Sequence, residues 1–224
     1  MLKTVINADV EPIQSYTFIT NDPAELIHIF HPFTQVALWR RSVNTVIETY
    51  LHHGLANNLF GSGFRTITHS PSALALDLFP DLPGREVLLE DVRLIAEIYT
   101  DLLGCDEIAL RFEVLDGVMC PRFHVDRTGI RLVCTYRGAG TEWINDELVD
   151  RGKLGPGYLG LPDKASGLFD ERTAIESAGL FDLVLFKGSL WQGNSHRGSI
   201  HRSPAVATAE RRVLLVMDAV WSQA

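Results

Sequence analysis

A strict alternation of apolar and polar residues over positions 107–115 limits the fold more than any other feature of the chain. The apolar residues occupy every second position, as they do on the buried face of a β-strand. Further short segments with the pattern of strands, separated by turn residues, lie at 122–126, 130–136, 182–188 and 211–218. Strands that follow one another without intervening helices form antiparallel sheets, which close into a barrel or pack as a sandwich. The C-terminal half therefore predicts a β-barrel or sandwich core.

The first 105 residues have a more helical pattern. The longest helix is expected between Pro83-Gly84 and Gly104, because apolar residues recur there on one helical face. Shorter helices are expected at 24–30 and after a cap at Ser42, and residues 61–71 are rich in turn formers. We expect one α+β domain over residues 1–224, with a mainly helical support at 1–105 and a mainly β core at 106–224.

A long excursion at residues 144–181 interrupts this core. It holds six glycines and two prolines, and its apolar residues follow no clear period. A segment of this length inside a compact domain is usually either a functional loop or a mobile one. The sequence leaves two interpretations open, a functional lid and an inert surface insertion.

The charge of the chain excludes several classes of partner. The formal net charge is −8, from 20 Lys and Arg against 28 Asp and Glu, and no cluster of basic residues is present. Long nucleic acids and anionic membranes attract clustered cations, so neither is an expected partner. The N-terminus reaches Asp9 before a signal-peptide core can form, and no apolar run has membrane-spanning length. With three cysteines and no CxxC pair, we expect a cytoplasmic protein.

A candidate metal site begins at His124 and Asp126. Residues two apart point to the same side of a strand, so an imidazole and a carboxylate can converge on one ion. His201, on a later predicted strand, is the expected third ligand, and His196 is a rival for that position. Cys120 lies four residues before His124, where it could be a fourth, sulfur ligand or a small buried side chain.

The order of these residues resembles the Fe(II)/2-oxoglutarate-dependent dioxygenase superfamily, in which a His-x-Asp pair is followed by a distal His and an Arg. The superfamily fold is the double-stranded β-helix, a jelly-roll or cupin-like barrel. The strings CPRFHVD, TYRGAGTEW, IHRSP and RRVLLVMD also resemble a narrower bacterial family of proteins of unknown function, encoded beside metal-handling GTPases. The resemblance implies that His124, Asp126 and His201 bind Fe(II), because two imidazoles and a carboxylate leave three coordination positions open.

The same resemblance implies that Arg211 or Arg212 binds 2-oxoglutarate, since a guanidinium can hold a carboxylate through two parallel hydrogen bonds. Strand alternation places only one of the two arginines inside the barrel. The superfamily arginine is commonly followed two residues later by Ser or Thr, but Val213 and Leu214 stand at those positions here. Residues in reach on the strand after the metal pair are further candidates for contacting the oxo acid: Arg131, Thr135 and Tyr136.

The resulting functional hypothesis is a dioxygenase that oxidises, by hydroxylation, an unknown small-molecule or peptide substrate with O2 and 2-oxoglutarate. Trp143 and Trp191 could line its pocket mouth or pack in the core. The alternative is a cupin-like protein without oxygenase activity that handles Zn(II) or another metal, with Cys120 in the ligand set. A third hypothesis is a degenerate barrel in which His124 and Asp126 only hydrogen-bond to each other.

Overall fold

The computed structural model describes residues 16–146, 149–170, 172–205 and 210–221, so the prediction for the first nine residues lies outside the described ranges. Ten strands are described: β1 (Tyr16–Thr20), β2 (Thr34–Trp39), β3 (Gly63–Thr68), β4 (Glu107–Leu115), β5 (Ile130–Arg137), β6 (Glu142–Ile144), β7 (Ile175–Ser177), β8 (Leu183–Lys187), β9 (Ile200–Arg202) and β10 (Arg212–Val220). The α-helices are α1 (Thr45–Ala56), α2 (Arg85–Leu103) and α3 (Asp163–Ser166). Short 3-10 helices are η1 (Pro23–Phe30), η2 (Pro71–Ala73), η3 (Leu76–Leu78), η5 (Arg151–Lys153) and η6 (Gly155–Tyr158).

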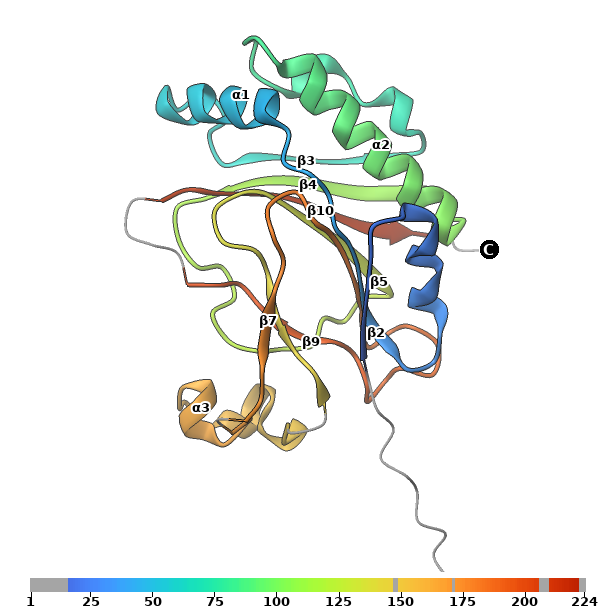
Figure 1. Cartoon of the computed structure of the whole chain (residues 1–224), viewed down its shortest axis with the longest axis vertical. Coiled ribbons are helices and arrows are strands. Elements are labelled where there is room, and N and C mark those ends of the chain that lie inside the picture. The colour runs from blue at the N-terminus through green and yellow to red at the C-terminus, as the bar shows by residue number, and fades with distance from the viewer. Residues whose placement is uncertain (1–15, 147–148, 171, 206–209, 222–224) are drawn as a thin grey trace, which may run out of the picture.

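Two sheets form the body of the molecule (Figure 1). The large sheet has seven strands in the order β1-β2-β8-β5-β10-β4-β3, and the small sheet has three in the order β7-β6-β9. Every pairing in them is antiparallel except that of β1 with β2. Helices α1 and α2 cover one face of the large sheet, and the small sheet lies on its other side. This is the predicted α+β fold with a mainly β core.

Alternation along the strands of the large sheet separates two apolar cores. In β5 the even-numbered residues from Ile130 to Tyr136 belong to the core under the helices. Val133, between them, belongs to a second core with Trp143 and Phe186, between the two sheets. A one-residue change of register would exchange these two sets, so burial on both faces determines the register.

Helix α2 forms where the sequence predicts it. Gly84 and Gly104 flank it, both with positive φ, and the Gly104 N–H donates to Thr100 O (2.8 Å), as expected for a glycine that ends a helix. The apolar face is buried on the sheet, and the Tyr99 hydroxyl donates to Ile130 O (2.5 Å). Helix α2 therefore ties the helical layer to β5, the strand that follows the metal-site segment.

Two predictions for the N-terminal half are wrong in detail. The turn-rich stretch contains β3, in which Gly63 has a φ of +91° and packs so closely on Phe112 O that any side chain would clash. The cap of α1 is Asn44, not Ser42, and its side chain accepts from the Val46 and Ile47 N–H groups. With β1 and β2, β3 joins the large sheet, so this half supplies strands as well as supporting helices.

Residues 122–126 do not form the expected strand. Only His124 pairs, in an isolated antiparallel bridge with His201. The excursion at 144–181 is ordered by short 3-10 helices, by α3 and by β7, which pairs with β6. Within the described ranges, no helix is both long and apolar enough to cross a lipid bilayer.

Candidate metal centre

The structure brings His124, Asp126 and His201 together at one edge of the space between the sheets. Their ligand atoms all lie within 4.8 Å of one another. The His124 Nε2 is 3.3 Å from Asp126 Oδ1, and the His201 Nε2 is 3.2 Å from Asp126 Oδ2. Two backbone hydrogen bonds join His124 and His201 (2.9 and 3.0 Å), which places their rings 4.6 Å apart. The three side chains can therefore bind one ion.

Backbone carbonyls select the ring nitrogen that each histidine presents. The His124 Nδ1 lies 2.9 Å from Arg122 O, and the His201 Nδ1 lies 3.2 Å from Ser199 O. A carbonyl can only accept, so Nδ1 is the donor to it in both rings, and Nε2 faces Asp126. In the metal-free protein an Nε2–H can donate to that carboxylate, and loss of this proton frees Nε2 as the ligand atom. This is the arrangement that orients metal-binding histidines in proteins. Stacking on Phe186, with ring centroids 4.6 Å apart, also holds His201.

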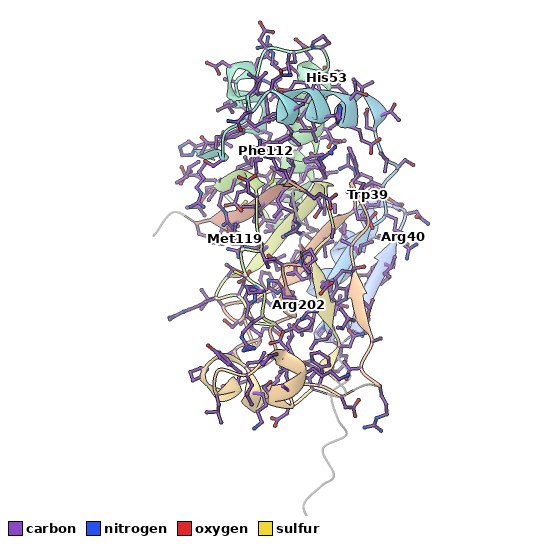
Figure 2. All side chains as sticks on the ribbon, turned by 90° about the vertical axis from the view of Figure 1, so that its left-hand side faces the viewer. Trp39, Arg40, His53, Phe112, Met119 and Arg202 are labelled. Carbon is purple, nitrogen blue, oxygen red and sulfur yellow. The ribbon has the colours of Figure 1, made fainter. Side chains whose placement is uncertain are left out.

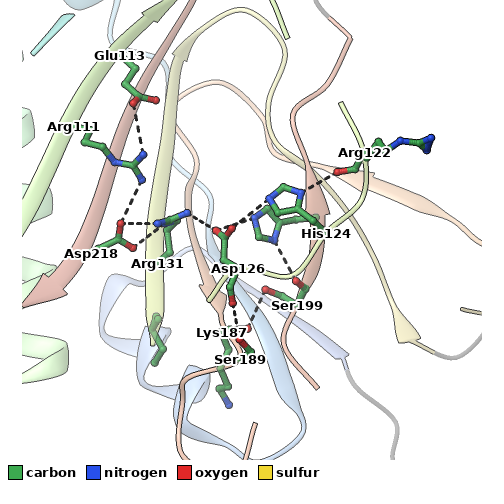
Figure 3. A network of polar contacts seen from close by, with 12 residues as sticks. Arg111, Glu113, Arg122, His124, Asp126, Arg131, Lys187, Ser189, Ser199 and Asp218 are labelled. Carbon is green, nitrogen blue, oxygen red and sulfur yellow. Dashed lines mark hydrogen bonds and ion pairs between the residues drawn. The ribbon is translucent and has the colours of Figure 1, made fainter. Parts of the chain in front are cut away.

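Arg131 connects the carboxylate of Asp126 to a chain of charges along the inner face of the large sheet (Figure 3). Its Nη1 donates to Asp126 Oδ2 (2.5 Å), while Nε and Nη2 donate to the two oxygens of Asp218 (2.8 and 2.7 Å). Arg111 then bridges Asp218 and Glu113 (3.3 and 3.6 Å). Because Asp218 takes two of its donors, Arg131 holds Asp126 in a fixed orientation.

These contacts favour the charged forms of the ligand carboxylate and of His124. Burial by itself would raise the pKa of Asp126, but the hydrogen bonds from His124 and His201 and the charge of Arg131 hold that pKa well below its usual range. Burial would lower the pKa of His124, yet the hydrogen bonds to Asp126 and Arg122 O raise it. Asp126 is therefore ionised at neutral pH, as a metal ligand must be.

The structure answers which arginine faces inward. Arg211 is partly exposed and contacts Asp116 and Asn58 (2.9 and 3.0 Å). Arg212 is 2% exposed, and its guanidinium donates to Ala139 O (2.7 Å) and to the hydroxyls of Thr135 and Thr141 (3.4 and 2.9 Å). Burial lowers the pKa of Arg212 to about 10, which still leaves it charged at neutral pH.

Arg212 is a buried cation with no ion pair to any carboxylate in the described part of the chain. A buried charge is normally paired, so this guanidinium suits a carboxylate supplied by a ligand. Arg212 lies on the side of the large sheet where the candidate metal residues are. It contacts Thr141, and Thr141 is two residues before Trp143, which pairs with His201 in the small sheet. The donor set thus fits the distal carboxylate of 2-oxoglutarate.

The hydroxyl missing after the arginine is supplied by a neighbouring strand. Leu214 occupies the position where the superfamily commonly has Ser or Thr, and the residue opposite Leu214 in β5 is Thr135. The Thr135 hydroxyl accepts from Arg212, as does that of Thr141. Thr141 was not singled out from the sequence, although it stands in the TYRGAGTEW string. The departure at Leu214 therefore leaves the arginine with hydroxyl partners.

Two of the further candidates for oxo-acid binding are placed elsewhere. Tyr136 points into the core under the helices and donates to Asp91 (2.7 Å), because it alternates with Thr135 along β5. Arg131 is on the inner face, but its donors are taken by Asp126 and Asp218. The geometry contradicts an oxo-acid contact for Tyr136 and makes Arg131 a partner of the Asp126 carboxylate.

The remaining sequence candidates separate clearly. Cys120 is exposed and does not belong to the ligand cluster, so the sulfur ligand that would favour zinc is not there. His196 is exposed, and His201, the favoured residue, lies beside Asp126. Trp143 is buried between the sheets. Trp191 stacks on Phe30 and lines a cavity of about 490 Å³ near the end of α2.

Comparison with known proteins agrees with this fold. A family model described as a protein of unknown function (DUF1826) matches residues 20–218, so the chain belongs to that family. No curated protein matches the sequence. The structure resembles dioxygenase for auxin oxidation 1 from Arabidopsis thaliana, solved with 2-oxoglutarate, with a TM-score of 0.53 at 10% identity over 93% of both chains.

A candidate oxygenase from Shewanella oneidensis has a TM-score of 0.51 at 12% identity over 93% of this chain and 90% of that one. At such low identity the likeness concerns the fold alone. The fold is the double-stranded β-helix of the Fe(II)/2-oxoglutarate oxygenases, as the sequence predicted.

Proposed function

We propose that this protein is an Fe(II)/2-oxoglutarate-dependent oxygenase. One observation carries the proposal: the cluster of His124, Asp126 and His201 lies on the same side of the large sheet as Arg212. In the described part of the chain, Arg212 is a buried cation without a carboxylate partner. Two histidines and one carboxylate with open positions are the ligand set of non-haem iron oxygenases. The similar fold of a dioxygenase solved with 2-oxoglutarate supports the same assignment.

In this proposal His124, Asp126 and His201 hold Fe(II), and Arg212 binds the distal carboxylate of 2-oxoglutarate. When bound, the metal and the oxo acid supply the oxidising chemistry, in which one oxygen atom of O2 goes to the substrate while 2-oxoglutarate becomes succinate and CO2. Arg131 keeps the Asp126 carboxylate ionised and oriented. Thr135 and Thr141 orient the Arg212 guanidinium toward its ligand.

The substrate class in this proposal is a small molecule or a peptide, and long nucleic acids are not expected, because the net charge is −8. All three cysteines are free thiols, which supports a cytoplasmic location. A functional link to metal-handling GTPases stays a prediction from the sequence resemblance.

The test is the spectrum of the anaerobic ferrous protein on addition of 2-oxoglutarate. We expect a metal-to-ligand charge-transfer band that His124→Ala abolishes. Arg212→Met should keep ferrous binding but weaken 2-oxoglutarate binding by about 30-fold or more, since the buried distal carboxylate of the oxo acid would lose its cationic partner. Arg211→Met is the matched control and should leave the band unchanged.

Two outcomes would contradict the proposal. An unaltered spectrum on adding 2-oxoglutarate would show that the oxo acid does not chelate the metal. Equal effects of Arg211→Met and Arg212→Met would show that the buried guanidinium is not the carboxylate site.

A further inference from the structure

The excursion between β6 and β8 contacts the residues that flank both metal-site histidines. Asp163, the first residue of α3, accepts a hydrogen bond from the Phe123 N–H (3.1 Å) and ion-pairs with Arg122 (3.2 Å). Its other pair is with Arg202 (3.2 Å). Phe123 precedes His124, and Arg202 follows His201. One side chain therefore holds the neighbours of both histidines.

Asp163 is buried, so these contacts are shielded from solvent. Its side chain is 8% exposed. At this depth a carboxylate without partners would cost desolvation free energy. Two guanidinium groups and one backbone N–H satisfy it. The loss of Asp163 would in turn leave Arg122 and Arg202 without this partner, and the Phe123 N–H without an acceptor.

Aromatic contacts reinforce the same junction. Arg202 lies over the Phe123 ring at 4.2 Å, and Arg122 lies over Tyr158 at 4.0 Å. Phe169 packs edge-on against Phe123. Arg202 appears beside the excursion in Figure 2. These contacts fix the excursion against the metal-site segments, which argues against the lid interpretation.

The His124 segment needs such support because it is not part of a regular strand. Its only strand-like pairing is the isolated bridge between His124 and His201. On the far side of His124, Asp126 O accepts from the Ser189 N–H (2.9 Å). On the near side, Asp163 supplies the corresponding contact. Without it, the Phe123 N–H would lose its acceptor, and the backbone bond from the Ser203 N–H to Cys120 O (2.9 Å) would still hold the start of the segment.

We propose that Asp163 is a positioning residue of the metal centre, which sets the placement of His124 relative to His201 from the excursion. The excursion is then a fixed support for the ligands rather than a lid or an inert insertion. The inference rests on the metal site of the proposed function, but on neither 2-oxoglutarate nor turnover.

The experiment measures Co(II) binding to the full chain, together with the visible spectrum of the bound cobalt and the thermal midpoint of the metal-free protein. Asp163→Asn keeps an oxygen for the Phe123 N–H and removes the charge, whereas Asp163→Ala removes both. We expect the Co(II) affinity to fall about tenfold in the first and up to about 100-fold in the second, as for other residues that orient metal ligands. The cobalt spectrum should change in both.

Two control variants separate positioning from stability. Asp170→Asn alters a carboxylate of the same excursion that, among the described residues, hydrogen-bonds to Arg172, and should bind Co(II) as the natural protein does. Tyr136→Phe removes a hydrogen bond to Asp91 on the helix side, so it should lower the thermal midpoint and leave the affinity unchanged.

The outcomes separate this inference from the proposed function. If both Asp163 variants lower the thermal midpoint but keep the natural Co(II) affinity and spectrum, Asp163 is only structural and the inference fails. If the natural protein binds Co(II) but not 2-oxoglutarate, the proposed function fails, while the loss of affinity in the variants still supports positioning. Absence of Co(II) binding to the natural protein would overturn both.

Discussion

The two faces of the large sheet are built from the same strands but have opposite characters. On the side of α1 and α2, alternate residues of β4, β5 and β10 form a continuous apolar core. On the inner side, the residues between them include charged groups that extend from Glu113 through Asp218 and Arg131 to Asp126. Figure 2 shows Phe112 toward the helical layer and Arg202 toward the opposite end.

This difference assigns the stability of the fold mainly to the helix side of the sheet and the orientation of bound ligands to the inner side. Apolar burial is non-directional and contributes most of the favourable free energy of folding. Buried charges cost desolvation free energy and are weak evidence for stability, but they can orient ligands. We therefore expect substitutions on the helix side to change the free energy of unfolding, and substitutions on the inner side to change metal or oxo-acid affinity.

The largest expected effect is on the helix side. Phe112 is buried and contacts the rings of Phe60, Phe64, Phe79 and Tyr136. Phe112→Ala should lower the free energy of unfolding by about 3–5 kcal/mol, measured by urea denaturation. The folded fraction should still bind metal with the natural affinity. A large loss of metal affinity in folded protein would show that the two faces are coupled.

The next effect concerns Arg131 on the inner side. Arg131→Met should weaken metal binding by about 10- to 100-fold, because Asp126 loses the donor that orients it. Arg111→Met is the control, since Arg111 contacts Asp218 but not Asp126, and calorimetric titration measures both. Tighter binding in Arg131→Met would mean that repulsion between the guanidinium and the metal outweighs orientation.

Lys187 is an exception to the comparison, because it is a charge on the helix side of β8. It is 2% exposed and donates to His31 O (2.9 Å), and burial together with the charge of Arg197 lowers its pKa from 10.5 to about 8. The unfolded chain therefore binds more protons between pH 8 and 10.5, so this residue destabilises the fold below pH 8 and ceases to do so as the pH rises.

The matching measurement compares the natural protein with Lys187→Met by denaturation at several pH values. The variant should be more stable at pH 7 by on the order of 2 kcal/mol, and the difference should close toward pH 10.5. A difference that does not depend on pH would mean that the ammonium is not desolvated as its burial suggests.

The smallest effects compare two consecutive residues of β5. Tyr136→Phe should lower the free energy of unfolding by about 1 kcal/mol, through loss of the hydrogen bond to Asp91, without changing 2-oxoglutarate affinity. Thr135→Val should change the other quantity: the affinity for 2-oxoglutarate should fall about fivefold, and the free energy of unfolding should change little. Denaturation and anaerobic titration of both variants measure the contrast. The reverse assignment of effects would contradict the facing of β5.

Patterns that depend on neighbours along the chain were predictable. The strand at 107–115 has the predicted bounds, and α2 begins and ends at its flanking glycines, because period and capping are local properties. By contrast, β3 was not predicted, since its Gly-rich start resembles a turn and its strand form depends on pairing with β4. The prediction of a strand at 122–126 was wrong because an alternating pattern does not guarantee a neighbouring strand along the whole segment, and His124 alone pairs there.

For the site, the sequence by itself determined the residue types and their order: His124, Asp126, His201 and one of two arginines. The tertiary structure decided the rest. It turned Arg212 inward and Arg211 outward, supplied hydroxyls from Thr135 and Thr141, and placed Cys120 outside the ligand cluster. It also brought Asp163 to the metal-site segments across about 40 residues of chain. Spacing along a strand is a local property, whereas facing and long-range contact depend on register and packing between elements distant in sequence.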